Sequence, residues 1–274
     1  MRGTIAAMES ASAPAAGVDI EPIPAFRDNY FWLLTRGDRA AVVDPGDAAP
    51  VGRVLADRQL KLDAILVTHH HADHAGGVAT LAAAGGVRIF TPAAEDIPTG
   101  RVAAQPLREG ERIEVLGVEL QVLDVPGHTA GHIAYYAPSL QALFCGDTLF
   151  AAGCGRLFEG TPAQMLDSLR KLARLPGATR VYCAHEYTLS NLRFARAVEP
   201  DSPRLQQREQ ACRGLRAQDR PTVPSTLAEE CATNPFLRVD VPAVRSAAER
   251  REAGASASAV ATFAALRAWK NVFA

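Results

Sequence analysis

The sequence has almost no net charge and lacks a long apolar run. Lysine and arginine together number 29, aspartate and glutamate number 30, and the formal net charge is −1. A near-neutral chain has no overall field that attracts nucleic acid or an anionic membrane, so we expect neither as a partner. No apolar run reaches the roughly 20 residues that a bilayer-spanning helix needs. We expect a protein that works as a monomer on a small molecule.

The sequence also lacks a paired set of cysteines. It has five, an odd number, and none forms a Cys-x-x-Cys pair, which argues against a zinc ribbon and a thioredoxin-like motif. An uncrosslinked protein of a reducing compartment is the simplest interpretation, and we expect the cytoplasm. Cys145 and Cys154 flank a candidate site, but small cysteines are most often buried in a core.

The chain divides into three regions by composition. Residues 1–17 are rich in alanine, serine and glycine and lack the apolar centre of a secretion signal, so we expect a disordered N-terminal extension. Residues 18–187 contain short β-branched segments broken by glycine, proline and aspartate, which predict strands. Residues 188–274 read as helical, with strand patterns absent, and are expected to form a smaller second domain.

Most of the predicted strands and helices can be bounded from the sequence. The strands are Phe31–Leu34, Ala40–Val43, Ala64–Val67, Val87–Phe90, Arg112–Val115, Glu119–Asp124, His132–Tyr136, Ala142–Cys145 and Arg180–Cys183. One helix opens at Asp73 or His74 and reaches about Ala84. Another begins at Thr161-Pro162, where threonine precedes proline as in many helix starts. Later helices cover Asn191–Val198, Pro203–Ala217 and Ala257–Trp269.

Histidine and aspartate gather directly after four of these strands. The run Thr68-His69-His70-His71-Ala72-Asp73-His74 follows one strand, and His128, Asp147 and His185 follow three others. Imidazole and carboxylate are ligands of borderline first-row metals, and seven such groups exceed the needs of one tetrahedral ion. A lone histidine pair is usually structural, but here five further groups would have to fall at strand ends by accident. The pattern predicts a binuclear metal hydrolase.

This pattern, with Gly-His128-Thr-Ala-Gly-His132 and Cys-Gly-Asp147-Thr, resembles the metallo-β-lactamase superfamily. The resemblance implies an α+β fold: a sandwich of two mixed sheets flanked by helices, with the metals at one edge, joined here to the smaller helical domain. It also implies the ligand assignment. His69, His71 and His128 would hold the first ion, Asp73, His74 and His185 the second, and Asp147 would bridge them.

Three other polar residues of this region are expected to have roles other than metal binding. His70 is expected to be a loop side chain, and His132 to support or pack against a ligand. Asp44 either orients the histidine-rich loop or only caps a turn. Zinc is the expected metal, with iron and manganese as alternatives, because all three accept this ligand set.

Two divalent ions lower the pKa of a bridging water toward neutrality, so hydroxide can serve as the nucleophile. No catalytic residue is needed beyond the metal ligands, and the sequence has no nucleophile-elbow motif. Hydrolysis of an acyl compound fits this chemistry. The ligand set alone does not choose among thioesters, lactones, β-lactams and phosphodiesters.

A narrower resemblance chooses among these substrates. Segments 25–30, 145–150, 153–160, 183–188 and 234–238, and the ending Leu266-Arg267-Ala268-Trp269-Lys270, resemble the glyoxalase II (hydroxyacylglutathione hydrolase) family over residues 18–274. This implies hydrolysis of S-D-lactoylglutathione and related 2-hydroxyacyl-glutathiones to glutathione and D-lactate, the second step of methylglyoxal detoxification. The implied substrate-binding residues are Arg156, Phe158, Tyr187, Arg267 and Lys270.

The physical chemistry of these residues agrees with an anionic substrate. Glutathione carries two carboxylates, and Arg267 and Lys270, three apart on a predicted helix, would share a face and could hold one of them. Phe158 stands where some family members carry tyrosine, so it offers ring packing and no hydroxyl. A persulfide dioxygenase of the same superfamily is the main rival, and the complete second ligand set argues against it.

Overall fold

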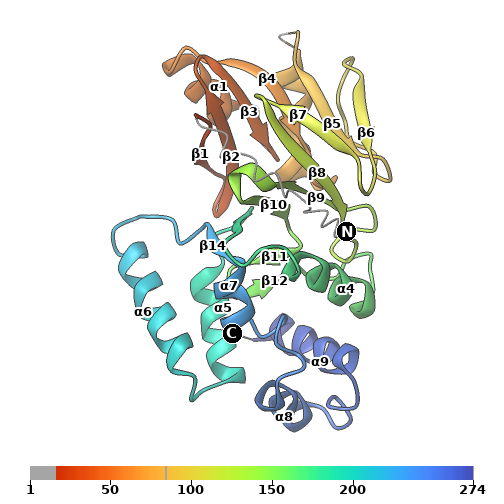
Figure 1. The fold of residues 1–274 in the computed structure, drawn as a ribbon, viewed down its shortest axis with the longest axis vertical. Helices are drawn as coiled ribbons and strands as arrows, with labels where there is room; N and C mark the ends of the chain where they lie inside the picture. The colour runs from red at the N-terminus through yellow and green to blue at the C-terminus, as the bar shows by residue number, and fades with distance from the viewer. Residues whose placement is uncertain (1–16, 84, 274) are drawn as a thin grey trace, which may run out of the picture.

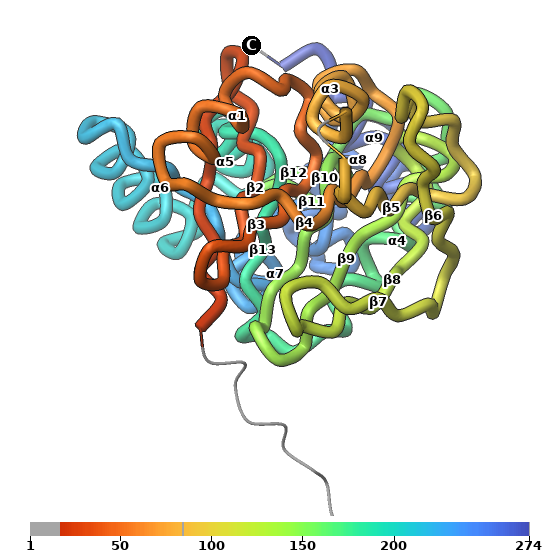
Figure 2. The backbone as a smooth tube through the Cα atoms, turned by 90° about the horizontal axis from the view of Figure 1, so that it is seen from above, coloured from red at the N-terminus to blue at the C-terminus, as the bar shows by residue number. Residues whose placement is uncertain are grey.

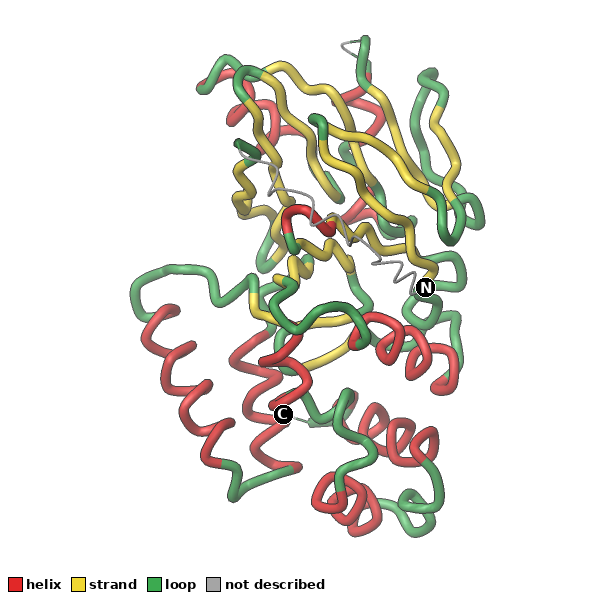
Figure 3. The backbone as a smooth tube through the Cα atoms, viewed as in Figure 1, coloured by secondary structure: helices red, strands yellow, loops and turns green. Residues whose placement is uncertain are grey.

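The structure is a computed structural model that describes residues 17–83 and 85–273. Strands fill one half of the molecule and helices fill most of the other (Figures 1 and 3). The predicted N-terminal extension lies outside the described residues apart from Gly17. The predicted α+β sandwich of two mixed sheets with a helical C-terminal region is confirmed.

The first sheet has six strands, numbered β1 to β6 in spatial order. Its first three strands pair antiparallel, and β3 to β6 pair parallel, so the sheet is mixed. The strands are β1 (Asp19–Ala25), β2 (Asn29–Arg36), β3 (Arg39–Val43), β4 (Lys61–Leu66), β5 (Arg88–Pro92) and β6 (Ala104–Leu107).

The second sheet also has six strands and the order β14-β13-β10-β9-β8-β7. Only the β10–β13 pair is parallel, and a two-stranded hairpin, β11–β12, lies outside both sheets. The strands are β7 (Arg112–Val115), β8 (Val118–Asp124), β9 (Ile133–Ala137), β10 (Ala142–Gly146), β11 (Leu149–Phe150), β12 (Gly153–Cys154), β13 (Arg180–Cys183) and β14 (Ser225–Thr226).

Strand β2 explains why the two sheets form a sandwich. Its successive side chains point to opposite faces of the sheet, as in any strand. Trp32 and Leu34 belong to the core between the sheets, whereas Phe31 and Leu33 belong to a second core that includes α1 and α3 residues. Both faces of this sheet are therefore buried. Viewed from above, helices α1 and α3 lie on the outer side of the sandwich (Figure 2).

The helices are bounded as follows: α1 (Ala48–Asp57), α2 (Ala72–Ala75), α3 (Val78–Ala82), the short 3₁₀ helix η1 (Pro138–Leu140), α4 (Pro162–Ala173), α5 (Thr188–Val198), α6 (Pro203–Arg216), α7 (Leu227–Thr233), α8 (Pro242–Arg251) and α9 (Ala259–Asn271). Helix α4 begins where the sequence predicts it, with a complete capping box between Thr161 and Gln164. Within the described residues, none of these helices has the length and hydropathy that a bilayer crossing demands.

The prediction of one continuous helix from Asp73 or His74 to about Ala84 is wrong. The chain forms two short helices, α2 and α3, separated at Gly76-Gly77. A Cβ atom on Gly76 would lie 2.6 Å from the Gly46 carbonyl oxygen, and one on Gly77 would lie 2.5 Å from that of Pro45. The two glycines therefore let the Pro45–Gly46 loop pack against this break, beside the histidine-rich segment.

The expectation that strands are absent after residue 187 is also wrong. Ser225 and Thr226 form β14, which pairs antiparallel with Val181 and Arg180 of β13. A strand of two residues shows no periodicity in the sequence. This short pairing attaches the helical part of the chain to the edge of the second sheet.

The topology brings four loops to one rim of the sandwich. Strands β4, β8, β10 and β13 end at Leu66, Asp124, Gly146 and Cys183, and each is followed by candidate ligands. The start of β2 joins them, because Asn29 forms a bridge with His185. Rigid strands on both sheets therefore position the site.

Candidate metal centre and substrate cavity

Three of the predicted ligands form a tight triangle of nitrogen atoms. His71 Nδ1 lies 3.1 Å from His69 Nε2 and 3.0 Å from His128 Nε2. A tetrahedral ion with bonds of about 2.0–2.1 Å separates its ligand nitrogens by roughly 3.3 Å. The triangle therefore has the size of one metal-binding site.

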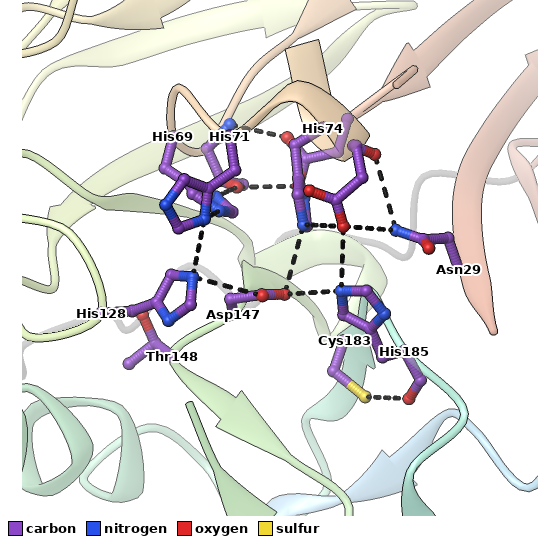
Figure 4. A network of polar contacts seen from close by, with 12 residues as sticks. Asn29, His69, His71, His74, His128, Asp147, Thr148, Cys183 and His185 are labelled. Atoms are coloured by element: carbon purple, nitrogen blue, oxygen red, sulfur yellow. Dashed lines mark hydrogen bonds and ion pairs between the residues drawn. The ribbon is translucent and has the colours of Figure 1, made fainter. Parts of the chain in front are cut away.

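A second group of ligands lies beside the first. Asp73 Oδ2 is 3.6 Å from both His74 Nε2 and His185 Nε2. Asp147 lies between the groups, as Figure 4 shows. Its Oδ1 is 3.4 Å from His74 Nε2 and 3.3 Å from His185 Nε2, and its Oδ2 is 3.3 Å from His128 Nε2. One oxygen thus faces each group, which is the arrangement of a bridging carboxylate.

Two buried atoms show that these residues fit metal ions. His74 Nε2 and Asp147 Oδ1 have no hydrogen-bond partner. A buried polar atom left unsatisfied costs about 1–3 kcal/mol, and a cation between these atoms would satisfy both. The structure brings all seven predicted ligands together, and a set of this size suits two divalent ions.

A shell of polar groups fixes the ligating nitrogens. His128 Nδ1 lies 2.9 Å from the Arg156 carbonyl oxygen, which can only accept, so this nitrogen carries the hydrogen and Nε2 keeps its lone pair. His185 Nδ1 lies 2.8 Å from Asp28 Oδ1, a carboxylate oxygen that accepts its hydrogen and again leaves Nε2 with a lone pair. Asn29 donates from Nδ2 to Asp73 Oδ2 at 3.0 Å. Such partners set the tautomer and orientation of metal ligands.

Asp44 orients the histidine-rich loop, the first of the two roles considered for it. The Thr68 amide and hydroxyl donate to its two oxygens at 2.7 Å each, and His74 Nδ1 lies 3.1 Å from Oδ2. Asp44 also lies close enough to His69 and His74 to form a ligand group with them. Because Asp44 contacts His74 at Nδ1, whereas Nε2 faces Asp73 and Asp147, Asp44 is placed to support His74 and not to share its metal.

The protonation of the site suits cations. Burial lowers the pKa values of His69, His71 and His128, which keeps these imidazoles neutral as metal ligands must be. Burial also disfavours charge on His74, but the carboxylates of Asp147, Asp44 and Asp73 outweigh it and raise its pKa to about 9. Because the pKa of His74 is raised although the side chain is buried, the surrounding carboxylates must stabilise a positive charge at this position.

Two further histidines surround the ligands without joining them. His132 is buried, stacks on His69 with ring centres 4.5 Å apart, and accepts the Asp147 amide hydrogen at Nε2 over 3.1 Å. His70 points away, with Nδ1 3.1 Å from Glu95 Oε2. Both lie where the sequence analysis expects them, in a supporting position and on the loop.

A cavity of about 650 Å³ opens from the metal ligands toward the helical part of the chain. It is large enough for a small-molecule ligand. All five predicted substrate-binding residues line it, together with part of α5 and the end of α9: Arg156, Phe158, Tyr187, Arg267, Lys270, Phe150, Cys154, Ser190, Asn191, Asn271 and Phe273.

The three cations among the predicted substrate-binding residues differ in their exposure and in the hydrogen bonds that they already form. Arg267 is buried and donates from Nη1 to the Cys154 carbonyl oxygen at 2.8 Å, so part of its guanidinium is occupied. Lys270 Nζ lies 3.1 Å from Ser190 Oγ, and Arg156 is exposed. Within the described part of the chain, none of these three cations forms a salt bridge with a carboxylate.

Two aromatic residues complete the mouth of the cavity. Tyr187 stacks parallel on His185, with ring centres 4.7 Å apart. Phe158 is 63% exposed and lies edge-on to His71 and His128. An exposed aromatic ring directly beside metal ligands is placed to contact a bound molecule.

Several residues of the site have no role predicted from the sequence. Asp28 and Asn29 are among them, although they lie in segment 25–30, which resembles the family. Their position could have indicated a role, because a carboxylate and an amide stand at the start of a strand, and the candidate ligands also lie at strand ends. Phe150 and Asn191 gave no comparable signal, because apolar and amide residues are common in any core or helix.

The fold and the cluster of histidine and aspartate side chains define the chain as a metallo-β-lactamase-type protein, and the cluster suits a binuclear divalent metal site. The metallo-β-lactamase superfamily model matches residues 25–185, and the model described as the hydroxyacylglutathione hydrolase C-terminus matches residues 186–273. The chain therefore belongs to the hydroxyacylglutathione hydrolase family, also called glyoxalase II.

Relatives support this membership over nearly the full length. Hydroxyacylglutathione hydrolases from Pseudomonas aeruginosa PAO1 and Cupriavidus taiwanensis are 55% and 58% identical to this chain. Each match covers 93% of this chain, and 100% and 98% of the respective relative. One from Alkalilimnicola ehrlichii is 59% identical, over 92% of this chain and 98% of that protein.

Two solved structures share the fold and show a moderate sequence likeness. BLEG-1 B3 metallo-β-lactamase has a TM-score of 0.60 and 25% identity, over 80% of this chain and 99% of its own. TTHA1623 in a di-iron-bound form has a TM-score of 0.57 and 28% identity, over 79% of this chain and 100% of its own.

Proposed function

We propose that this protein hydrolyses S-D-lactoylglutathione and related 2-hydroxyacyl-glutathiones to glutathione and the free hydroxy acid. One observation carries the proposal: the cavity that opens from the metal ligands also holds three cations without a carboxylate partner among the described residues. A glutathione thioester carries a carboxylate on each of its two terminal residues and an electrophilic acyl carbonyl on its central sulfur. Cations and candidate metal ligands in one cavity would suit these groups.

Each part of the site has a distinct task in this reaction. When bound, two divalent ions supply Lewis acidity, which lowers the pKa of a water molecule and polarises the acyl carbonyl. The residues that would hold them are His69, His71, His128, Asp73, His74 and His185, with Asp147 between the two. Zinc is the proposed metal, and iron and manganese suit the same ligands.

The protein residues around the ligands bind and orient the substrate. Arg267, Lys270 and Arg156 would pair with the glutathione carboxylates, while Tyr187 and Phe158 pack on its arm. The acyl carbon gains an oxygen from water, and its bond to sulfur breaks. Glutathione leaves as a thiolate, whose pKa of about 8.5 makes it a good leaving group, so no general acid is required.

The two parts of the chain would divide this work. We propose that residues 18–187 form the metal-binding catalytic domain and residues 188–274 the glutathione-binding domain. Arg267 and Lys270 come from α9, and Ser190 and Asn191 from α5, whereas the metal ligands all precede residue 186. The five free cysteines agree with a reducing compartment such as the cytoplasm.

The test is to follow the thioester absorbance of S-D-lactoylglutathione with purified protein of known metal content. We expect rapid hydrolysis by a monomer with close to two metals per chain, loss of activity on chelation, and recovery when zinc is returned. A thioester without the glutathione arm is the matched control, and it should react far more slowly. Equal rates on both thioesters, or an inactive protein with two bound metals, would overturn the proposal.

A further inference from the structure

The β11–β12 hairpin forms one wall of the cavity and depends on helical residues for its conformation. It begins two residues after Asp147, and Phe150, Cys154 and the following Arg156 line the cavity. Phe150 contacts the rings of His185 and Tyr187, with centres 5.8 and 5.3 Å away. The position of this hairpin therefore sets the shape of the space beside the second group of ligands.

Side chains from the helical part hydrogen-bond the tip of the hairpin, in addition to the pairing between its two short strands. Asn234 Nδ2 donates to the carbonyl oxygens of Phe150 and Gly153 at 3.2 and 2.8 Å. The Ala152 amide donates to Glu230 Oε2 at 2.8 Å, and Asn191 Nδ2 donates to the Ala151 oxygen at 3.0 Å. All three side chains come from α5 or from α7 and its C-cap.

These hydrogen bonds hold the backbone at the tip of the hairpin in an unfavourable conformation. Ala152 has a φ of 54°, in the left-handed region that residues with a Cβ atom rarely occupy. Gly153 has no room for a side chain, because a Cβ atom there would lie 2.4 Å from Asn191 Nδ2. A strained, buried turn of this kind persists only where its surroundings fix it.

Glu230 is the centre of the anchor. Its side chain is fully buried, and one oxygen faces Arg208 while the other accepts from both Ala152 and Asn234. Arg208 Nη1 in turn bonds Thr233 Oγ1 at 2.5 Å, at the last turn of α7. A buried ion pair is poor evidence for stability alone, but it specifies one arrangement of the groups it touches.

We infer that Glu230 and Asn234 are positioning residues for the substrate cavity. They hold the β11–β12 hairpin, and through it Phe150 and the Cys154 carbonyl that accepts from Arg267. Residues 188–274 thus have two effects on the cavity. They line part of it directly, and they fix the β11–β12 hairpin that forms another wall. The kinetic side of this inference rests on the proposed function, whereas its structural side does not.

Hydrogen exchange of the hairpin, followed by mass spectrometry, tests the structural side without any substrate. Glu230→Gln replaces one carboxylate oxygen, which accepts hydrogen bonds, with an amide nitrogen, which cannot. Asn234→Ala removes both side-chain hydrogen bonds to the hairpin, together with those to Glu230 and from the Phe236 amide, and leaves the Arg208–Glu230 pair in place. We expect residues 149–156 to exchange at least tenfold faster in Asn234→Ala, and in Glu230→Gln if that variant folds. Cys231→Ser is the control, because this side chain lies on the same helix, is exposed and, among the described residues, forms no hydrogen bond with the hairpin or with Arg208.

The kinetic test separates positioning from a general loss of stability. Metal-loaded Asn234→Ala should show a KM for S-D-lactoylglutathione raised at least fivefold, with kcat changed by less and the metal content unchanged. A merely structural role would reduce the fraction of active enzyme, lowering the apparent kcat and leaving KM as it was. Unchanged exchange in residues 149–156, or an unchanged KM, would overturn the inference. If wild-type protein does not hydrolyse the thioester, the proposed function fails, and the exchange experiment still decides the inference.

Discussion

Single residues beside the ligands should control metal affinity. Asp28 Oδ1 lies 2.8 Å from His185 Nδ1 and leaves Nε2 aimed at Asp73 and Asp147. In Asp28→Ala the imidazole loses the partner that fixes its tautomer, so we expect affinity at the second site to fall about 10–100-fold. Competition with a chromophoric chelator measures this change.

The control for this prediction is Asp38→Ala, which removes an exposed carboxylate whose one ion pair among the described residues is with Lys61. It should leave both metal affinities unaltered. An Asp28→Ala protein that competes with the chelator as well as wild type would show that Asp28 does not support His185.

Lys270 should make ligand binding depend on pH. Burial, followed by the nearby cations Arg267, Arg193 and Arg156, lowers its pKa to about 8. Below that pH the side chain is an ammonium that can pair with a carboxylate, and above it this charge is lost. The affinity for a non-hydrolysable S-alkylglutathione should therefore weaken above pH 8, approaching a factor of ten per pH unit.

Calorimetric titrations between pH 7 and 9.5 check this expectation. Lys270→Arg keeps its charge over that range, so its affinity should follow only the titration of the ligand. Identical pH profiles for the variant and the wild type would contradict a role for the Lys270 charge.

At the scale of elements, helix α4 should stabilise the loop that carries His128. Its Ser168 hydroxyl donates to the Pro126 carbonyl oxygen at 2.8 Å, and a Cβ atom on Gly127 would lie 2.7 Å from Met165 Cβ. Thr161→Ala removes the capping box at the start of α4, which costs about 1 kcal/mol. We expect the midpoint of thermal unfolding to fall by roughly 2–4 °C.

Asp167→Ala is the matched change on the exposed side of the same helix. Its free energy of unfolding should stay within about 0.5 kcal/mol of wild type. Equal losses in the two variants would mean that the cap contributes nothing beyond helix propensity.

Elements with strong local patterns could be predicted from the sequence. The capped start of α4 and the strand Arg112–Val115 are found where the sequence places them. Strand β1 was missed because Pro22 and Pro24 interrupt its pattern, which an edge strand tolerates. The break between α2 and α3 was also missed, since two glycines alone do not end a helix and the break here involves their contact with the distant Pro45–Gly46 loop.

The residues of the candidate site also divide into those that a local sequence pattern reveals and those that depend on long-range contacts. Metal ligands are visible in a sequence because their chemistry is rare and they follow strands directly. The anchoring role of Glu230 is not visible, because a glutamate on a helix is usually solvated and nothing local shows that the chain buries it against Ala152. Contacts between residues this far apart follow from tertiary packing, which the local pattern does not encode.

At the scale of the whole molecule, the two parts of the chain should unfold together. One hydrophobic core contains Phe144 of the second sheet together with Phe194, Phe236 and Phe263 of the helical part. No separate apolar core for the helical part is present among the described residues beyond a small cluster around Leu205. Because burial of shared surface couples the parts, we expect a single transition, although the sequence divides the chain at residue 187.

The two tryptophans of the sequence make this measurable, since Trp32 lies in β2 and Trp269 in α9. Trp269→Phe leaves a reporter for the sandwich, and Trp32→Phe leaves one for the helical part. The fluorescence midpoints of each variant in denaturant should coincide with its midpoint by circular dichroism. A helical part that loses its signal first would instead show that residues 188–274 unfold as an independent domain. In that case the anchor on the β11–β12 hairpin would be released before the metal centre unfolds, and substrate affinity would decline at denaturant concentrations where the sandwich is still intact.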